Sequence, residues 1–106
     1  MQTKKYAHYT IISINSTTDL DDLIPTLRNP PLNKQNIIIN LLKSNVSSQW
    51  IVQHLYPFYY IWKKNNQSFI LVSNVIRDKS LKDIILINSL EEAIDFFNMD
   101  YLTRNI

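Results

Sequence analysis

The sequence predicts an α/β fold with a mixed sheet of four to five strands, a largely parallel centre and helices packed on it. Three short apolar runs carry this prediction, at residues 36–42, 68–73 and 84–87. They are too continuously apolar for strands with one face in water, so we expect them to be covered on both faces. A helix-length segment separates the first two runs, and a crossover helix makes the strands that it joins parallel. The first run, NIIINLL, is expected at the centre of the sheet.

Length and composition favour one domain over residues 1–106. A chain that is 45% hydrophobic and 19% charged can bury a core and is unlike a disordered regulator. The absence of cysteine excludes disulfides, thiolate catalysis and cysteine-bound zinc. The absence of glycine excludes a glycine-rich phosphate loop and leaves left-handed backbone positions to asparagine.

The apolar runs and the opening residues predict a cytoplasmic protein with no membrane partner. MQTKKYAHYT lacks the apolar core of a signal peptide. No apolar run approaches the roughly 20 residues that a membrane helix needs.

The first quarter of the chain is expected to hold one strand or a pair of strands and then a helix. Tyr6 to Ile14 is rich in β-branched and aromatic residues, and Lys4 and Lys5 would protect a sheet edge. Apolar residues at helical spacing follow, namely Leu20, Leu23, Ile24 and Leu27. Thr18 is a candidate N-cap of this helix. Pro25 should shorten or bend it.

Asn29-Pro30-Pro31 ends the first helix, and a second is expected from Ser47 or Ser48 to Lys64. Its core stripe comprises Ile51, Leu55, Phe58 and Trp62. Pro57 lies inside it and costs roughly 3 kcal/mol in a helix interior. Burying each large apolar side chain contributes roughly 1.5 to 3 kcal/mol. We therefore expect one helix with a kink at Pro57.

The last helix is predicted to begin at a capping box. Ser89 and Glu92 have the required spacing and precede an apolar stripe. The stripe comprises Leu90, Ala93, Ile94, Phe97 and Tyr101. Residues 74–83, ahead of the third apolar run, should hold at most one helical turn.

No constellation of side chains predicts catalysis or a metal site. His8 and His54 have no carboxylate at i+3 or i+4, and a zinc site needs three or four ligands. Asp19, Asp21 and Asp22 cluster at the start of the first helix, where compensation of the helix dipole explains them. A nucleophilic serine would have neither a glycine elbow nor a placed histidine. We expect no enzyme activity, no metal and no cofactor.

Basic side chains raise nucleic acid as a partner. Six of them could flank one edge of the sheet: Lys43, Lys63, Lys64, Arg77, Lys79 and Lys82. The formal net charge is only +2, however. Proteins held by phosphate contacts commonly make about 6 to 10 of them. Solvated lysines are the simpler interpretation, so nucleic acid is not the expected partner.

The second helix carries more aromatic surface than one helix face can bury. Beyond its core stripe lie Trp50, Tyr56, Tyr59 and Tyr60. Exposed rings would indicate a protein partner or a homodimer. Alternatively, the kink at Pro57 turns both helix faces into the core, and the sequence leaves these two interpretations open.

The order of elements around three segments of the sequence resembles that of a known family. The segments are NIIINLL before the polar loop, KKNNQSFILV from the second helix into the next strand, and INSLEEAIDFF at the end. In this order, which covers most of the chain, the sequence resembles the STAS domain, the fold of bacterial anti-sigma factor antagonists. The resemblance implies a single STAS-like domain that regulates by binding an anti-sigma factor or a kinase-type regulator.

In that family a serine at the start of the second helix, within an Asp-Ser-Ser-Gly-like motif, is phosphorylated by the partner kinase. Ser47 and Ser48 occupy the matching place, where a phosphate would add charge to a docking surface at a helix N-terminus. Val46 stands in place of the aspartate, and Gln49 and Trp50 replace the small residues. The resemblance implies phosphorylation of Ser47 or Ser48, on a motif that departs from the family's pattern.

The C-terminal half also resembles small STAS-like chains that carry a ribonuclease Z label. That enzyme needs a His- and Asp-rich metal motif, and nothing comparable is present in this sequence. The label would therefore describe a neighbour or a partner of such a chain.

We predict a non-enzymatic regulatory module that binds another protein through the loop Lys43–Ser48 and the aromatic face of the second helix. The residues expected to contact the partner are Lys43, Ser44, Asn45, Val46, Gln49, Trp50, Tyr56 and Tyr60. The alternative from another functional class is an accessory role in nucleotide binding or RNA processing.

Overall fold

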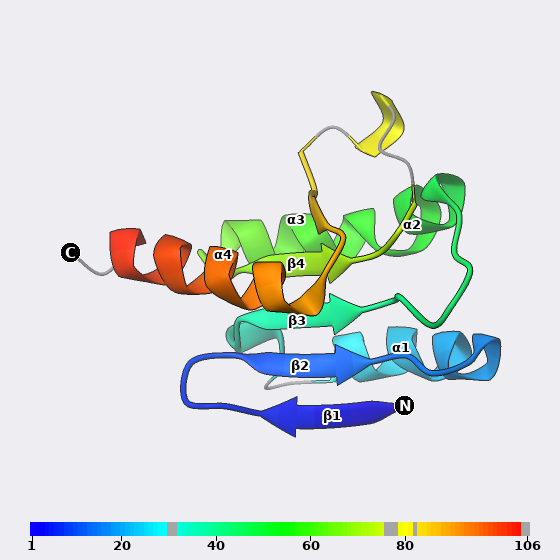
Figure 1. Cartoon of the computed structure of the whole chain (residues 1–106), viewed down its shortest axis with the longest axis horizontal. Helices are drawn as coiled ribbons and strands as arrows, with labels where there is room; N and C mark the ends of the chain where they lie inside the picture. Colours follow the sequence, from blue (N-terminus) through cyan, green and yellow to red (C-terminus); the bar gives the residue numbers. More distant parts are fainter. Residues whose placement is uncertain (30–31, 76–78, 82, 105–106) are drawn as a thin grey trace.

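The computed structural model describes residues 1–29, 32–75, 79–81 and 83–104, and it contains one five-stranded sheet with helices on both faces (Figure 1). The strands are β1 (Gln2–Lys5), β2 (Thr10–Ser13), β3 (Ile37–Asn40), β4 (Phe69–Val72) and β5 (Ile85–Ile87). The helices are α1 (Thr17–Arg28), α2 (Ser48–His54), α3 (Tyr56–Lys64) and α4 (Leu90–Arg104). The described residues also form two 3-10 turns, η1 (Leu32–Lys34) and η2 (Lys79–Leu81).

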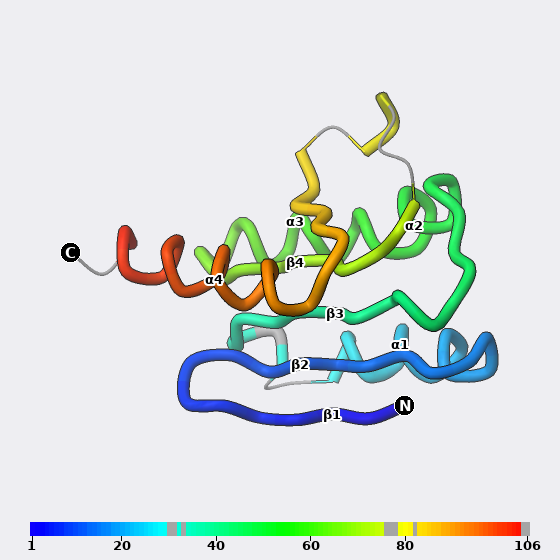
Figure 2. Tube along the Cα trace, viewed as in Figure 1, coloured from blue at the N-terminus to red at the C-terminus, as the bar shows by residue number. Residues whose placement is uncertain are grey.

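The sheet is mixed, with a parallel centre. Its strands stand in chain order from β1 to β5. β1 pairs antiparallel with β2, whereas β2, β3, β4 and β5 pair in parallel. Figure 2 follows the chain as it returns to the same end of the sheet before β3 and before β4. The predicted α/β class and largely parallel centre are confirmed.

β3 is the central strand and is buried on both faces. Ile37, Ile38 and Ile39 each have an exposed fraction of 0%. Ile37 and Ile39 belong to one core cluster and Ile38 to the other, because successive side chains of a strand point to opposite faces. The prediction of a central strand covered on both sides is confirmed.

Helices form one layer on each face of this sheet (Figure 1). α1, α2 and α3 share a core with residues of β2, β3 and β4. α4 covers the opposite face, where Ala93 and Phe97 pack with Ile11, Ile38 and Ile70. The apolar stripes predicted for the first and last helices therefore face the sheet. No helix in the described part of the chain is long and apolar enough to cross a membrane.

Serine caps fix the starts of α1 and α4. The Oγ of Ser16 accepts the N–H of Asp19 at 3.4 Å, so Ser16 is the N-cap of α1. Thr18 was predicted as this cap, but it lies in the first turn, because Ser16 already has the extended backbone that a cap needs. The Oγ of Ser89 accepts the N–H of Glu92 at 3.1 Å, which confirms the predicted start of α4.

The predicted second helix is two helices, α2 and α3, which meet at Leu55. Hydrogen bonds from Leu55 N to Ile51 O (2.8 Å) and from Tyr59 N to Leu55 O (2.9 Å) link them. Pro57 lies in the first turn of α3, where backbone N–H groups have no partner within the helix. A single helix kinked at Pro57 is therefore wrong, because the break places the proline where it removes no hydrogen bond.

The chain opens with a hairpin whose strands differ from the predicted bounds. β1 precedes Tyr6, and residues 6–9 form the turn, in which Tyr6 N donates to Tyr9 O at 2.8 Å. All four residues of β1 are exposed, so this edge strand has no apolar pattern for the sequence to reveal. Lys4 and Lys5 do lie on an outer strand, as expected for protection of an edge.

β5 forms the other edge of the sheet and is less buried than predicted. Its three residues are half-buried, since no described strand pairs with its outer side. Before it, the described residues hold one 3-10 turn, η2, as expected for this segment. Arg77 and Lys82 of the predicted basic cluster lie outside the described residues, as do Pro30 and Pro31.

Asparagine takes the left-handed position at the end of α3. Asn66 has φ = 57°, and its N–H donates to Lys63 O at 3.1 Å. The N–H of Gln67 donates to Trp62 O at 2.9 Å. These two bonds form a Schellman ending, a role that glycine usually fills. The expectation that asparagine replaces glycine at such a position is confirmed here.

Replacing each helical proline by alanine tests the helix break. Pro25→Ala should raise the free energy of unfolding by about 2 kcal/mol, because Pro25 interrupts the interior of α1. Pro57→Ala is the matched control and should lower it by up to about 1 kcal/mol, since only the flexibility of the unfolded chain changes. Chemical denaturation measures both values. An equal gain for both variants would show that Pro57 also interrupts a helix interior.

Candidate functional site

The loop between β3 and α2 is held by its own hydrogen bonds. The side-chain oxygen of Asn40, the last residue of β3, accepts the N–H of Leu42 at 3.1 Å. Ser44 donates twice to the carbonyl of Leu41, from its N–H at 3.1 Å and from its hydroxyl at 3.0 Å. These bonds turn the chain outside the carboxyl end of the central strand and leave the rest of the loop in a defined position.

The two serines predicted as phosphorylation sites have different surroundings. Ser47 is exposed and is the N-cap of α2, where its Oγ accepts the N–H of Trp50 at 3.0 Å. Ser48 is the first residue of α2 and is half-buried. Ser47 is therefore the more accessible of the two hydroxyl groups.

The residues predicted to contact a partner differ in exposure. The exposed ones are Lys43, Asn45, Gln49 and Tyr60. The half-buried ones, Val46, Trp50 and Tyr56, pack against the core under α1, α2 and α3. Ser44 is only 7% exposed, and its hydroxyl holds the turn, so its side chain points inward instead of toward a partner.

The tyrosines of α3 divide between core and surface. Tyr59 is buried, and its hydroxyl donates to Asp83 O at 2.9 Å. Tyr60 is 52% exposed, beside Ile61 at 44%. The ring of Tyr59 is therefore part of the core, and the ring of Tyr60 is at the surface. Tyr60 follows Ser48 by twelve residues, or roughly 18 Å at 1.5 Å per helical residue, so it lies apart from the loop.

A hollow of about 270 Å³ lies between this loop and the chain that leaves β4. It is outside the carboxyl ends of two parallel strands, β3 and β4. Its lining combines hydroxyl, amide and apolar side chains, among them Ser44, Asn45, Val46, Ser47, Ser73 and Asn74. Among the described residues of that lining, none is charged. These residues offer hydrogen bonds and apolar contact.

The two histidines lie on different elements and stack on other rings. His54 of α2 stacks on Trp50 with centroids 4.8 Å apart, and its Nδ1 lies 3.0 Å from Trp50 O. His8, in the β1–β2 turn, stacks on Tyr101 of α4 at 4.6 Å. Within residues 1–29, 32–75, 79–81 and 83–104, no three His, Cys, Asp or Glu side chains come together as metal ligands would.

The carboxylate of Asp19, in the first turn of α1, is held by two contacts. The Met1 ammonium lies 2.8 Å from its carboxylate, and the N–H of Asn15 donates to it at 2.9 Å. These contacts, the ammonium first, hold the pKa of Asp19 below its ordinary value. Ionised Asp19 therefore stabilises the fold at neutral pH, and this contribution is lost as the pH falls through the lowered pKa.

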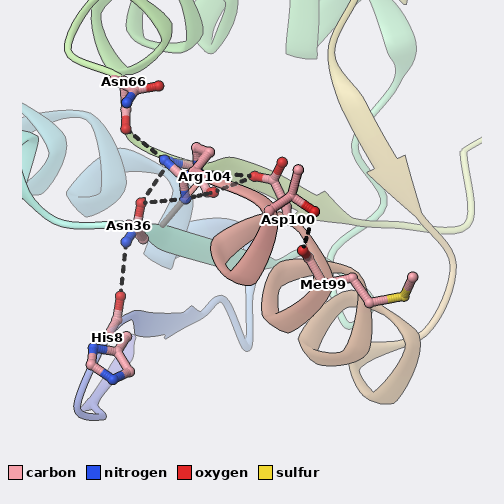
Figure 3. Close-up of polar contacts among 8 residues, drawn as sticks. His8, Asn36, Asn66, Met99, Asp100 and Arg104 are labelled. Carbon is pink, nitrogen blue, oxygen red and sulfur yellow. Dashed lines mark hydrogen bonds and ion pairs between the residues drawn. The ribbon is translucent and has the colours of Figure 1, made fainter. Parts of the chain in front are cut away.

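A polar cluster that the sequence did not reveal lies at the amino ends of the parallel strands, at the end of the sheet opposite to the loop after β3. It joins Asn36 before β3 and Ser68 before β4 to Asp100 and Arg104 of α4 (Figure 3). The Oδ1 of Asn36 accepts the N–H of Ser68 at 2.7 Å, and its Nδ2 donates to His8 O at 2.9 Å. Asn36 thereby links the hairpin turn, β3 and β4.

Arg104 ties the end of α4 to this cluster. Its guanidinium donates to the Ser68 hydroxyl at 2.9 Å and to Asn36 Oδ1 at 3.4 Å. It also donates to the carbonyl of Asn66, and its Nε lies 3.5 Å from Asp100 Oδ2. A cation in the last turn offsets the helix dipole as well. These hydrogen bonds join the end of α4 to the residues before β3 and β4, so we assign the cluster to holding α4 on the sheet.

No family model matches the sequence, and no curated protein matches it. The functional assignment therefore depends on the geometry of the site and on the resemblance in the order of elements.

Removing the amide of Asn36 tests the structural role of the cluster. Asn36→Ala should lower the free energy of unfolding by about 1 to 3 kcal/mol, because it leaves the buried N–H of Ser68 without its acceptor. Asn98→Ala, an exposed site on α4, is the matched control and should change it by less than about 0.5 kcal/mol. Urea denaturation compares the two. Equal effects would contradict a stabilising role for Asn36.

Proposed function

We propose that this chain is a non-enzymatic regulatory module of the anti-sigma factor antagonist type, acting in the cytoplasm by binding another protein. The contact surface is the loop after β3 together with the first turn of α2. The observation that carries the proposal is that this loop is internally hydrogen-bonded and still exposes Lys43, Asn45, Ser47 and Gln49. The STAS-like order of elements supports it.

A loop held in place before binding is suited to protein recognition. Ordering a flexible loop costs conformational entropy at the moment of binding, and a preorganised loop avoids that cost. The hydrogen bonds of Asn40 and Ser44 hold this loop without using its exposed side chains. Val46 and Trp50 are half-buried beneath it and anchor it to the core. Its exposed polar groups are then available to a partner surface.

Ser47 is the proposed switch in this surface. A phosphate adds about 1.5 to 2 negative charges and three acceptor oxygens at neutral pH. On Ser47 it would stand in the middle of the exposed part of the loop, between Asn45 and Gln49. A kinase-type partner is what the resemblance implies. Tyr60 and Ile61, exposed on α3, are a second surface on which the partner or another copy of the chain would add contacts.

Three substitutions of Ser47 separate the effect of an added negative charge from the effect of losing the N-cap. Ser47→Asp adds charge, whereas Ser47→Asn keeps a good N-cap without charge, and both should leave stability nearly unchanged. Ser47→Ala removes the cap and should lower the free energy of unfolding by about 1 kcal/mol. Quantitative affinity capture from a lysate of the source cells should show a partner that binds wild type and Ser47→Asn equally and Ser47→Asp roughly tenfold more weakly.

Asn98→Asp is the control for this experiment. It adds the same charge at an exposed site on α4, on the opposite face of the sheet from α2. It should leave capture of the partner unchanged. If every captured protein responds equally to Ser47→Asp and to Asn98→Asp, the loop is not the contact surface.

A further inference from the structure

A second hollow, of about 260 Å³, opens at the amino edge of the sheet beside the polar cluster. The hairpin turn, the residues before β3 and β4, and the end of α4 all contribute to it. The lining side chains with binding chemistry are Lys5, Tyr6, His8, Lys34, Gln35 and Gln67. It is a different site from the loop after β3, which lies at the carboxyl ends of the parallel strands.

The charge of this hollow favours an anion. Lys5 and Lys34 are both exposed, and the described residues of the lining include no aspartate or glutamate. Neither lysine takes part in an ion pair found among the described residues. A neighbouring hollow shares Asn36, Gln67 and Tyr101 with it and reaches Arg104, whose charge is paired with Asp100. A cleft lined by one sign of charge concentrates ligands of the opposite sign.

Aromatic rings form part of the wall. Tyr6 stacks on Tyr9 with centroids 4.9 Å apart and planes 18° apart. His8 stacks on Tyr101 with centroids 4.6 Å apart and planes 24° apart. Burial and the neighbouring Tyr6 raise the pKa of Tyr9, so the ring of Tyr9 stays uncharged at neutral pH. Stacked rings of this kind provide a platform that a further planar ring can extend.

Amide groups beside the rings can form hydrogen bonds with the edge of a planar ligand. Gln35 and Gln67 both line the hollow, and an amide offers two donors and an acceptor. The Oε1 of Gln35 accepts the hydroxyl of Thr10 at 2.8 Å, which fixes the orientation of its amide. Side-chain amides are common partners of nucleobase edges.

We propose that this hollow binds a single phosphorylated nucleoside, with its base stacked on the ring of Tyr6 or His8 and its phosphate beside Lys5 and Lys34. The volume is close to the roughly 300 Å³ at which small-molecule pockets begin, so it holds one nucleotide and not a dinucleotide cofactor. One phosphate contact is also compatible with a net charge of only +2. The same chemistry is present in a free mononucleotide and in the terminal nucleotide of an RNA strand.

Titrations with adenosine 5′-monophosphate, adenosine and inorganic phosphate test the two halves of the ligand. The intact chain should bind the monophosphate saturably at low salt, with chemical-shift changes at Tyr6, Lys34 and Gln67. Adenosine and phosphate should each bind roughly tenfold more weakly, because each lacks one set of contacts. Inorganic phosphate binding as tightly as the monophosphate, or no binding of the monophosphate at all, overturns the proposal.

Paired lysine substitutions locate the site. Lys5→Gln with Lys34→Gln should weaken binding of the monophosphate by roughly tenfold or more, since two charge-assisted contacts are lost. Lys64→Gln with Lys79→Gln removes the same charge at exposed lysines outside the hollow and should change binding by less than about twofold. Equal losses of affinity in the two double variants would mean that the monophosphate is attracted by the overall positive charge, and would overturn the proposal that it binds in this hollow.

An RNA hexamer with and without a 5′-phosphate distinguishes the two sources of the nucleotide. Tighter binding of the phosphorylated hexamer than of the monophosphate identifies the RNA end, and the reverse identifies the free nucleotide. Both results require the lysine pair. Ser47→Asp should leave these titrations unchanged, so the outcome is independent of the protein-binding loop.

Discussion

Burial of three consecutive isoleucines, on both faces of one strand, is the constraint on which the rest of this structure depends. Ile37 and Ile39 face one side of β3 and Ile38 faces the other, and none of them has exposed surface. Such a strand needs a helical layer on each face, because a bare face would leave apolar side chains in water. α1, α2 and α3 supply one layer, and α4 supplies the other.

Covering both faces leaves the ends of the parallel strands for binding. The loop with Ser47 leaves the carboxyl end of β3, and the hollow with Lys5 and Lys34 lies at the amino ends. The outer strands contribute differently, since β1 carries lysines and β5 is short and half-buried. The cluster of Asn36 and Arg104 holds α4 near the amino ends of the strands, and Asn36 and Tyr101 of α4 also line that hollow.

Local patterns predicted the central elements because each is encoded within a few residues. The apolar runs of β3 and β4, the stripe of α4 and its cap at Ser89 all belong to this group. β1 was missed because its exposed residues carry no apolar pattern. The break at Leu55 was missed because the buried positions Ile51, Leu55, Phe58 and Trp62 keep helical spacing through it.

For the candidate sites, the sequence by itself predicted a helix that starts at Ser47 or Ser48 and a polar loop after the central strand. Both depend on neighbours within a few residues, as for the N-cap bond from Trp50 N to Ser47 Oγ. Only the tertiary structure decided that Arg104 meets Asn36, 68 residues away, and that Lys5 and Lys34 line one hollow. Such contacts depend on strand order and on which face each helix covers, and these are set by packing of the whole chain.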